Sequence, residues 1–301
     1  MRPILLLGSA GQLGWELQRS LAPLGHVVPL TRHDNLDGRG CGNLLDPPSL
    51  RETVLRLRPA AIVNAAAYTA VDRAEQEPDV AHTINAVAPG VLAEAATEVG
   101  ALVVHFSTDY VFDGSGKAPW TESALTAPCS VYGRTKLDGE ERVRAAAPNR
   151  HLIFRSSWVY AARGNNFAKT MLRLAGERDR LTVIDDQIGT PTGADLIADV
   201  TAHALRQALR DAGTCGTYHL AARGETSWFG YARFVLDTAR ELSPSRPLKV
   251  QELVPIPTSA YPTAAQRPLN SRLDTRRLCA SFGLTLPDWR LGVRRMLQEI
   301  L

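Results

Sequence analysis

Residues 4–14 read Ile-Leu-Leu-Leu-Gly-Ser-Ala-Gly-Gln-Leu-Gly, and a helical pattern follows from Trp15 to Leu24. This order predicts a buried strand, a glycine turn and a helix. Glycines let the backbone turn tightly and approach a pyrophosphate, which then accepts hydrogen bonds from the free amides at the helix N-terminus. The spacing Gly-x-x-Gly-x-x-Gly departs from the Gly-x-Gly-x-x-Gly fingerprint, but the strand-turn-helix context still predicts a dinucleotide site. The expected cofactor-binding residues of this turn are Gly8, Gly11, Gln12, Leu13 and Gly14.

Short apolar runs alternate with helical stretches up to about residue 155. After the first strand, runs suited to strands occur at 26–30, 60–64, 101–106 and 151–155. Such alternation predicts an α/β protein with a Rossmann-type, doubly wound parallel sheet. We expect residues 1–155 to form the dinucleotide-binding domain and residues 156–301 to form mainly a smaller α/β substrate-binding lobe. Within the second part, a stretch at about 181–220 is expected to return partly to the sheet.

A proline interrupts one long helical stretch, Val80–Val99. Pro89 lacks the amide hydrogen that a helix interior needs, so it should kink or break the helix locally. Gly100 then ends it. The proline-rich stretch Pro244–Pro268 is expected in the smaller lobe.

The end of the second strand indicates which nicotinamide cofactor is preferred. A protein that prefers NAD usually has an acidic residue there for the ribose 2′-hydroxyl. This chain has Arg32, which suits a 2′-phosphate and therefore NADPH, or which is an ordinary surface residue. Asp34 lies two residues further on, so NADH remains possible.

Tyr132 and Lys136 are spaced as a catalytic pair would be. Residues at i and i+4 share one face of a helix, so the ammonium can lie near the phenol. A phenol titrates near pH ~10, and a neighbouring positive charge lowers that pKa. Thr108 follows an expected buried strand, at the edge of the sheet where ligands bind, and its hydroxyl could bond a substrate carbonyl. Alone, the Tyr-x-x-x-Lys spacing more often marks nothing but a solvated helix face.

Composition excludes several other classes of protein. The 301 residues carry a net charge of +3 with no evident basic cluster, which gives no case for nucleic-acid binding. Four widely spaced cysteines, without a Cys-x-x-Cys pair, indicate neither a zinc site nor a disulfide framework. No apolar run approaches the ~20 residues that a membrane-spanning helix needs. A cytoplasmic protein that acts on a small molecule is therefore expected.

Five longer motifs together resemble a known family. They are Gly-Gln-Leu-Gly at 11–14, Val-Asn-Ala-Ala-Ala-Tyr-Thr-Ala-Val-Asp at 63–72, Ser-Thr-Asp-Tyr-Val-Phe-Asp-Gly at 107–114, Tyr-Gly-x-Thr-Lys at 132–136, and Arg-Pro-x-Asn-Ser at 267–271. This set is similar to the dTDP-4-dehydrorhamnose reductase family of the extended short-chain dehydrogenase/reductases. The likeness extends over nearly the whole chain.

The resemblance implies a role for each matching residue. Thr108, Tyr132 and Lys136 would be catalytic, and Tyr132 and Lys136 would also contact the cofactor. Further cofactor contacts would come from Asn43, Leu44, Ala66, Ala67 and Tyr68. The sugar-nucleotide substrate would meet Thr108, Asp109, Trp158, Arg267 and Asn270. Arg267, with Asn270 beside it, is expected to hold the diphosphate, since a guanidinium suits phosphate oxygens, or it is an ordinary surface or ion-pair arginine. The resemblance also suggests a homodimer with Mg²⁺ held by Glu16, Asp195 and Glu299, although three unrelated surface acids are the simpler interpretation.

The implied reaction is NADPH-dependent reduction of the C4 keto group of dTDP-4-dehydro-6-deoxy-L-mannose to dTDP-L-rhamnose. Related dehydratases follow the threonine with Asp-Glu, whereas here Asp109-Tyr110 follows it, and tyrosine is a poor base near neutral pH. Another nucleotide-sugar reductase or epimerase is one alternative. A non-catalytic, NADP-binding regulatory subunit is another, against which the intact Thr-Tyr-Lys set argues.

Overall fold

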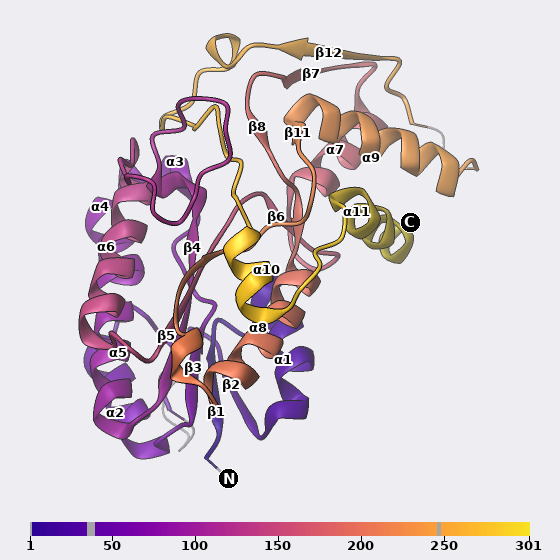
Figure 1. The fold of residues 1–301 in the computed structure, drawn as a ribbon. Coiled ribbons are helices and arrows are strands. Elements are labelled where there is room, and N and C mark those ends of the chain that lie inside the picture. The colour runs from indigo at the N-terminus through magenta and orange to yellow at the C-terminus, as the bar shows by residue number, and fades with distance from the viewer. Residues whose placement is uncertain (1, 35–39, 246–247) are drawn as a thin grey trace.

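Six parallel strands form the central sheet of the protein (Figure 1). The computed structural model describes residues 2–34, 40–245 and 248–301, so residues 246 and 247 of the proline-rich stretch lie outside it. The strand order is β10-β5-β4-β3-β1-β2. Their bounds are β1 Ile4–Leu7, β2 Val27–Leu30, β3 Ala61–Asn64, β4 Leu102–Thr108, β5 His151–Ser156 and β10 Gly216–His219.

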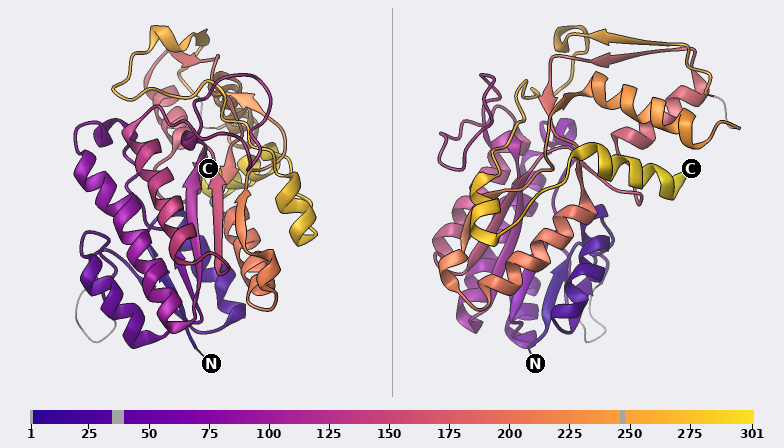
Figure 2. Two further views of the ribbon diagram at one scale, coloured as in Figure 1. Left: turned by 60° about the vertical axis from the view of Figure 1, so that its left-hand side comes forward. Right: turned by 45° about the vertical axis from the view of Figure 1, so that its right-hand side comes forward.

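Successive residues of β1 enter two different hydrophobic cores, because side chains alternate across a strand. Ile4 and Leu6 pack in one core, on the face covered by α1 (Gln12–Leu21), α8 (Ala194–Ala208) and α10 (Arg276–Phe282). Leu5 and Leu7 pack in the other, under α2 (Pro47–Leu57), α5 (Ala88–Val99) and α6 (Val131–Ala146). Figure 2 shows these two helical layers enclosing the sheet.

The strand order reverses at β1, which pairs with β2 on one side and β3 on the other. In sheets of this kind, ligands bind beyond the carboxyl ends of the strands at such a switch point. The doubly wound parallel fold expected from the sequence is confirmed, and the glycine turn that follows β1 lies at this point.

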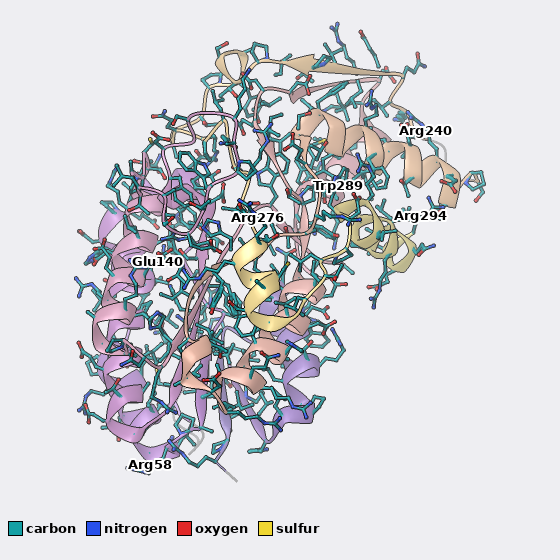
Figure 3. The ribbon with its side chains drawn as sticks, viewed as in Figure 1. Arg58, Glu140, Arg240, Arg276, Trp289 and Arg294 are labelled. Atoms are coloured by element: carbon teal, nitrogen blue, oxygen red, sulfur yellow. The ribbon has the colours of Figure 1, made fainter. Side chains whose placement is uncertain are left out.

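The sheet and the helices that flank it form the lower part of the molecule in Figure 1, called the lower layer here. A smaller upper layer lies beyond the carboxyl ends of the strands. It contains α7 (Phe167–Glu177), α9 (Trp228–Leu242) and α11 (Trp289–Ile300), whose apolar side chains share a core around Tyr231 and Trp289. A parallel pair, β7 (Arg180–Ile184) and β12 (Glu252–Ile256), completes it. Figure 3 places Trp289 in this upper layer and Glu140 in the lower one.

Short elements lie between the longer helices and strands. They are β6 (Val159–Tyr160) with β9 (Thr192–Gly193), β8 (Ile188–Gly189) with β11 (Thr226–Ser227), α3 (Val71–Ala74), and the 3-10 turns η1 (Ala22–Leu24), η3 (Asp109–Val111), η4 (Ala212–Thr214) and η5 (Thr258–Ala260). None of the helices in the described part of the chain has the length and hydropathy needed to cross a membrane.

The stretch at 181–220 is only partly in the lower layer. Its helix α8 covers the sheet and its strand β10 joins the sheet, but Leu181–Ile184 belong to β7 in the upper layer. The reason is that β7 finds its partner in β12, a strand from the proline-rich stretch. The helix α10, far along the chain, also packs on the lower sheet. A domain boundary near residue 155 stays a prediction.

The stretch with Pro89 is not broken: its backbone stays in the right-handed helical region, but it contains a π-helical segment. It consists of α4 (Pro78–His82), a π-helical segment η2 (Thr83–Val87) and α5. Such π-helical insertions are frequent at functional sites. Gly100 ends α5 in the left-handed conformation, at φ 66°, as a glycine after a helix commonly does.

Gly139 of α6 lies directly against this π-helical segment. A Cβ atom built there would lie 2.0 Å from the carbonyl oxygen of Asn85. We therefore expect Gly139→Ala to destabilise the protein by about 1–3 kcal/mol, as overpacking does. The free energy of unfolding in urea measures this.

Gly176→Ala in α7 is the matched control, since a Cβ added there would meet no other atom within 4 Å. That change should stabilise the helix by roughly 0.5–1 kcal/mol, because glycine is a poor helix former. Equal effects at the two positions would contradict the close-approach argument.

Candidate active site

The glycine turn after β1 is shaped to admit a ligand to the helix N-terminus. Gly8 has a φ of 77°, and a Cβ there would lie 2.6 Å from the backbone nitrogen of Ala66. A Cβ at Gly14 would lie 2.1 Å from the carbonyl oxygen of Gly8. Gly11 precedes α1 without a capping side chain, and the first turn of α1 contains no acidic residue. The first amides of α1 therefore lack intrahelical acceptors and suit a pyrophosphate.

Two residues of this turn have side chains that are already engaged. The Gln12 Oε1 atom accepts a hydrogen bond of 3.3 Å from Asn166 Nδ2, and Leu13 packs against the hydrophobic core under α1, α8 and α10. Their backbone amides are therefore what they can offer to a cofactor.

Arg32 lies exposed just beyond β2, with its Nε donating to His33 Nε2 over 3.0 Å. The Asp34 carboxylate accepts from the backbone nitrogen of Thr31 at 2.6 Å. Asn43 Oδ1 accepts from the backbone nitrogen of Leu45, and Leu44 is buried in the core under α2. The Asn43 and Leu44 side chains thus shape the chain locally, whereas the Arg32 guanidinium is accessible to an anion.

Asn85, which the sequence interpretation did not assign to the site, organises the segment Ala66–Tyr68. Its Oδ1 accepts from the Tyr68 backbone nitrogen at 2.9 Å, and its Nδ2 donates to the Tyr68 carbonyl at 3.1 Å. The same Nδ2 donates to Thr135 Oγ1 at 3.2 Å, which ties this segment to α6. Tyr68 in turn donates its phenol hydrogen to Glu77 at 2.6 Å. The proline four residues after Asn85 was the signal that could have drawn attention to it.

Tyr132 is placed beside Thr108 by the first turn of α6. Ser130 caps that turn by accepting from the Gly133 amide at 3.1 Å. A Cβ at Gly133 would lie 2.3 Å from the carbonyl oxygen of Tyr110, so only glycine allows the helix this close to η3. The Thr108 hydroxyl is near enough to hydrogen-bond the phenol of Tyr132, which lowers the pKa of the latter. The two expected proton-handling hydroxyls are therefore neighbours.

Burial dominates the electrostatics of Tyr132 and Lys136. It raises the pKa of Tyr132 to about 12, an effect to which the Asp109 carboxylate adds. It lowers the pKa of Lys136 to about 8, although Glu140 opposes this. Lys136 Nζ donates to the Phe106 carbonyl at 2.5 Å. The expectation that Lys136 lowers the pKa of Tyr132 is therefore wrong for this structure, because the phenol is desolvated and the ammonium is directed to the strand.

Asp109 is buried, with 2% of its surface exposed, and accepts from the Thr108 hydroxyl at 3.1 Å. Burial raises the pKa of this carboxyl to about 6. It is close enough to the two hydroxyls to contact a sugar bound there.

Arg267 forms an ion pair with Asp72, which precedes it by 195 positions in the sequence. Its Nη2 bonds the Asp72 Oδ2 atom at 2.5 Å, and Asp72 Oδ1 accepts from the Ala265 backbone nitrogen. Its Nη1 is buried, and no hydrogen-bond partner for it occurs in the described part of the chain. The guanidinium thus has a structural pairing with Asp72, and it also lies close enough to Tyr110 to lower the pKa of that phenol.

Asn270 is a structural residue here rather than an open substrate ligand. Its Nδ2 donates to the carbonyls of Ser115 and Ala118 at 3.1 and 2.9 Å. Its Oδ1 accepts from the backbone nitrogen of Arg272 at 3.3 Å. The expected direct contact between its side chain and a diphosphate is therefore corrected to support of the loop at 113–120.

Trp158 has an unusual backbone conformation, with φ at 48°. Such a left-handed conformation is rare for a bulky residue and is typical of functional sites. Its ring stacks on Trp228 with centroids 3.6 Å apart, and Gly189 leaves the space that the indole fills. The tryptophan is thus fixed between the upper and lower layers.

The structure does not bring the three expected magnesium ligands together. Glu16 lies near Arg19, while Arg295 lies 3.8 Å from Asp195 and 3.5 Å from Glu299. No group of three or more acids, histidines or cysteines suited to a metal occurs among the described residues. The single chain therefore gives no support to the magnesium site, which stays a prediction, and Arg295 pairs with two of the three carboxylates.

Comparisons with known proteins identify the family of the chain. The family model of the RmlD substrate binding domain matches residues 1–301. A dTDP-4-dehydrorhamnose reductase of Salmonella typhimurium is 55% identical over 297 residues, covering 99% of this chain and 97% of the relative. The chain belongs to the dTDP-4-dehydrorhamnose reductase family.

Solved structures of family members have the same fold. The crystal structure of a dTDP-4-dehydrorhamnose reductase from Clostridium acetobutylicum is 34% identical, with a TM-score of 0.88 and 99% coverage of both chains. One from Bacillus anthracis, in complex with NADP, is also 34% identical, with a TM-score of 0.86 and 99% coverage of both chains.

The burial of Asp109 should be visible in the pH dependence of stability. A carboxyl whose pKa is raised from 3.8 to about 6 costs the folded protein stability as pH rises through that window. Asp109→Asn removes the charge, so its stability relative to the parent should increase between pH 4 and 7.5 by up to about 3 kcal/mol. Urea unfolding at both pH values measures the difference.

Asp113→Asn serves as the control, because the backbone amide of Ser115 lowers the pKa of that exposed carboxyl. It should show no such gain. A pH-independent effect of Asp109→Asn would contradict a raised pKa at this position.

Proposed function

We propose that the protein reduces the C4 keto group of dTDP-4-dehydro-6-deoxy-L-mannose, also called dTDP-4-dehydro-β-L-rhamnose, to dTDP-L-rhamnose with NADPH. The observation that carries this proposal is the pairing of Thr108, at the carboxyl end of β4, with the partly buried Tyr132 of α6. The names of the relatives support the substrate.

NADPH fits the residues present. The glycine turn leaves room where side chains would collide, and the uncapped first turn of α1 suits a pyrophosphate. Arg32 would hold the 2′-phosphate, since a guanidinium pairs well with phosphate oxygens. The segment Ala66–Tyr68, together with Tyr132 and Lys136, would line the nicotinamide end. When bound, NADPH supplies a hydride to C4, and the NADP complex of the Bacillus anthracis relative supports this choice.

Residues of the protein orient the carbonyl and supply the proton. Thr108 donates a hydrogen bond to the substrate carbonyl and orients it. Tyr132, with a pKa of about 12, keeps its proton at neutral pH and gives it to the C4 oxygen as negative charge develops there. Lys136, one turn along the same helix, donates to the Phe106 carbonyl and would contact the nicotinamide end of the cofactor. Trp158, Asp109 and Arg267 would position the sugar nucleotide.

The neighbouring Tyr110 supports reduction over elimination. A dehydratase needs a base at this position, and burial raises the pKa of Tyr110 above its ordinary value of 10.0. A phenol of this kind stays protonated near neutral pH and cannot accept a proton from carbon. Another nucleotide-sugar reductase or an epimerase remains the alternative within the superfamily.

The decisive assay mixes the protein with NADPH and enzymatically prepared dTDP-4-dehydro-6-deoxy-L-mannose and follows the loss of nicotinamide absorbance. Turnover separates the reductase from a non-catalytic NADP-binding regulatory subunit, which would bind the cofactor without consuming it. A homodimer and a cytoplasmic location stay predictions from the family resemblance.

Tyr132→Phe should lower kcat by at least the ~10²–10⁴-fold typical of general acid catalysis, because it removes only the hydroxyl. Cofactor affinity should change little. Tyr110→Phe is the matched control, since its ring packs edge-on against Tyr132 at 5.5 Å, and it should cost less than tenfold. Near-parental turnover by Tyr132→Phe would mean that the proton comes from another group.

Arg32→Ala should raise the KM for NADPH by about tenfold or more, the loss expected for a charged hydrogen bond to phosphate, and leave the KM for NADH nearly unchanged. Steady-state kinetics with both cofactors measures this. An equal effect on the two would exclude the 2′-phosphate assignment.

Arg267→Ala should weaken binding of the sugar nucleotide by about tenfold or more while NADPH binding is retained. Asp72→Asn separates charge from structure, because it weakens the ion pair and leaves the guanidinium in place. Titration calorimetry with dTDP measures both variants. If Asp72→Asn weakens binding as much as Arg267→Ala, then Arg267 acts only by holding the loop.

A further inference from the structure

Three buried polar side chains form a row that begins at Lys136 and leads away from Tyr132. Lys136 has 2% of its surface exposed, His105 has 0% and Asn64 has 2%. Asn64 and His105 are directly paired residues on the adjacent strands β3 and β4. His105 Nε2 lies 3.4 Å from Lys136 Nζ, and His105 Nδ1 lies 3.4 Å from Asn64 Nδ2. The proposed mechanism assigns no role to His105 or Asn64.

The hydrogen bonds of Asn64 determine which ring nitrogen of His105 carries hydrogen. Asn64 Oδ1 accepts from the backbone nitrogen of Ala66 at 3.2 Å, so the amide nitrogen faces His105. An amide nitrogen only donates, and His105 Nδ1 must therefore be the acceptor. Burial and the charge of Lys136 lower the pKa of His105 well below its ordinary value, so the ring is neutral. A neutral ring with a bare Nδ1 carries its hydrogen on Nε2, which faces Lys136.

This arrangement satisfies the hydrogen bonds of one protonation state of Lys136 better than those of the other. As an ammonium, Nζ has only donors, and one of them would face the Nε2 hydrogen of His105. As a free amine, Nζ has a lone pair that accepts that hydrogen while still donating to the Phe106 carbonyl. The row from Asn64 to Lys136 is completely hydrogen-bonded only when the lysine has released a proton.

Other charged groups around Lys136 do not cancel this effect. Glu140 on α6 favours the ammonium, but its two oxygens are bound by Arg155 of β5 at 2.8 and 2.6 Å and by Arg144 at 2.9 Å. Burial of Lys136 lowers its pKa and outweighs the influence of Glu140.

We propose that His105, oriented by Asn64, is a positioning residue that holds the Lys136 nitrogen at the end of β4, beside the Phe106 carbonyl, and favours the release of its proton. The proposal rests on the reductase function. After Tyr132 gives its proton to the C4 oxygen, a phenolate remains. The Lys136 ammonium returns a proton to it, which leaves a phenol and an amine, and the amine then takes a proton from solvent. His105 stabilises the amine in this cycle and stays neutral throughout.

The tautomer can be tested without any turnover. Nitrogen NMR of the full-length protein with labelled histidine should show His105 with hydrogen on Nε2 and a bare Nδ1 between pH 6 and 9. His105→Gln identifies the signal by its disappearance. A hydrogen on Nδ1, or a charged ring, would overturn the proposal whatever the protein's activity.

Asn64→Asp reverses the hydrogen-bond direction with almost no change in shape. The carboxylate would accept from Nδ1, so the hydrogen should move to Nδ1, and Nε2 would become an acceptor for the ammonium. The high-pH limb of the kcat/KM profile should then move upward by about one unit, a tenfold change in proton affinity. The negative charge of the new carboxylate would also favour the ammonium and move the limb upward. The tautomer of His105 is therefore measured by NMR in this variant as well.

His105→Gln is the second variant, and it covers the case in which Asn64→Asp does not fold. Its side-chain oxygen can accept from the ammonium, so the limb should again move upward. His151→Gln is the matched control, because His151 is a buried histidine of β5 that bonds the Ala147 carbonyl and not Lys136. An unmoved limb in His105→Gln, or an equal shift in His151→Gln, would overturn the proposal. Absence of turnover in the parent protein would contradict the reductase function and leave the NMR result to decide the role of His105.

Discussion

The candidate active site depends on how closely α6 approaches its neighbours. Gly133 lies against the carbonyl of Tyr110, and Gly139 lies against the carbonyl of Asn85, with no space for a Cβ at either position. These two contacts bring the start of α6 against η3 and its middle against the π-helical segment. Because Tyr132 and Lys136 lie close to these glycines in sequence, the close approach buries Lys136, covers part of Tyr132 and places the phenol beside Thr108. Wider spacing would leave them on a solvated helix face.

Burial then determines the chemistry available at neutral pH. Desolvation is the largest influence on Tyr132, Lys136 and Asp109, and it disfavours the charged form of each. The phenol keeps the proton that it must donate, and the lysine holds its proton less tightly than a lysine in water. The bidentate pair between Glu140 and Arg155 lies in the same interior and neutralises a carboxylate that would otherwise bind the ammonium. The packing of α6 therefore determines the protonation states of the site.

Polar side chains far apart in sequence complete the arrangement. Asn85 connects the segment Ala66–Tyr68 to α6, and Asp72 meets Arg267 across 195 positions. The same kind of long-range pairing explains why Asn270 is structural: its amide nitrogen donates to the carbonyls of Ser115 and Ala118. Arg295 likewise pairs with the distant Asp195. Residue type and motif gave no sign of either partner.

The amino-acid sequence by itself determined the doubly wound sheet, the glycine turn after β1 and the Tyr-x-x-x-Lys pair on one helix face. These features follow from local rules, since the periods of strands and helices and the conformational freedom of glycine act over a few residues. Only the tertiary structure decided that Leu181–Ile184 pair with β12, that Pro89 accompanies a π-helical segment, and that His105 and Asn64 lie beneath the lysine. Those outcomes depend on which distant groups meet in the interior. There the loss of water decides protonation and hydrogen-bond direction, and no local pattern encodes the partner.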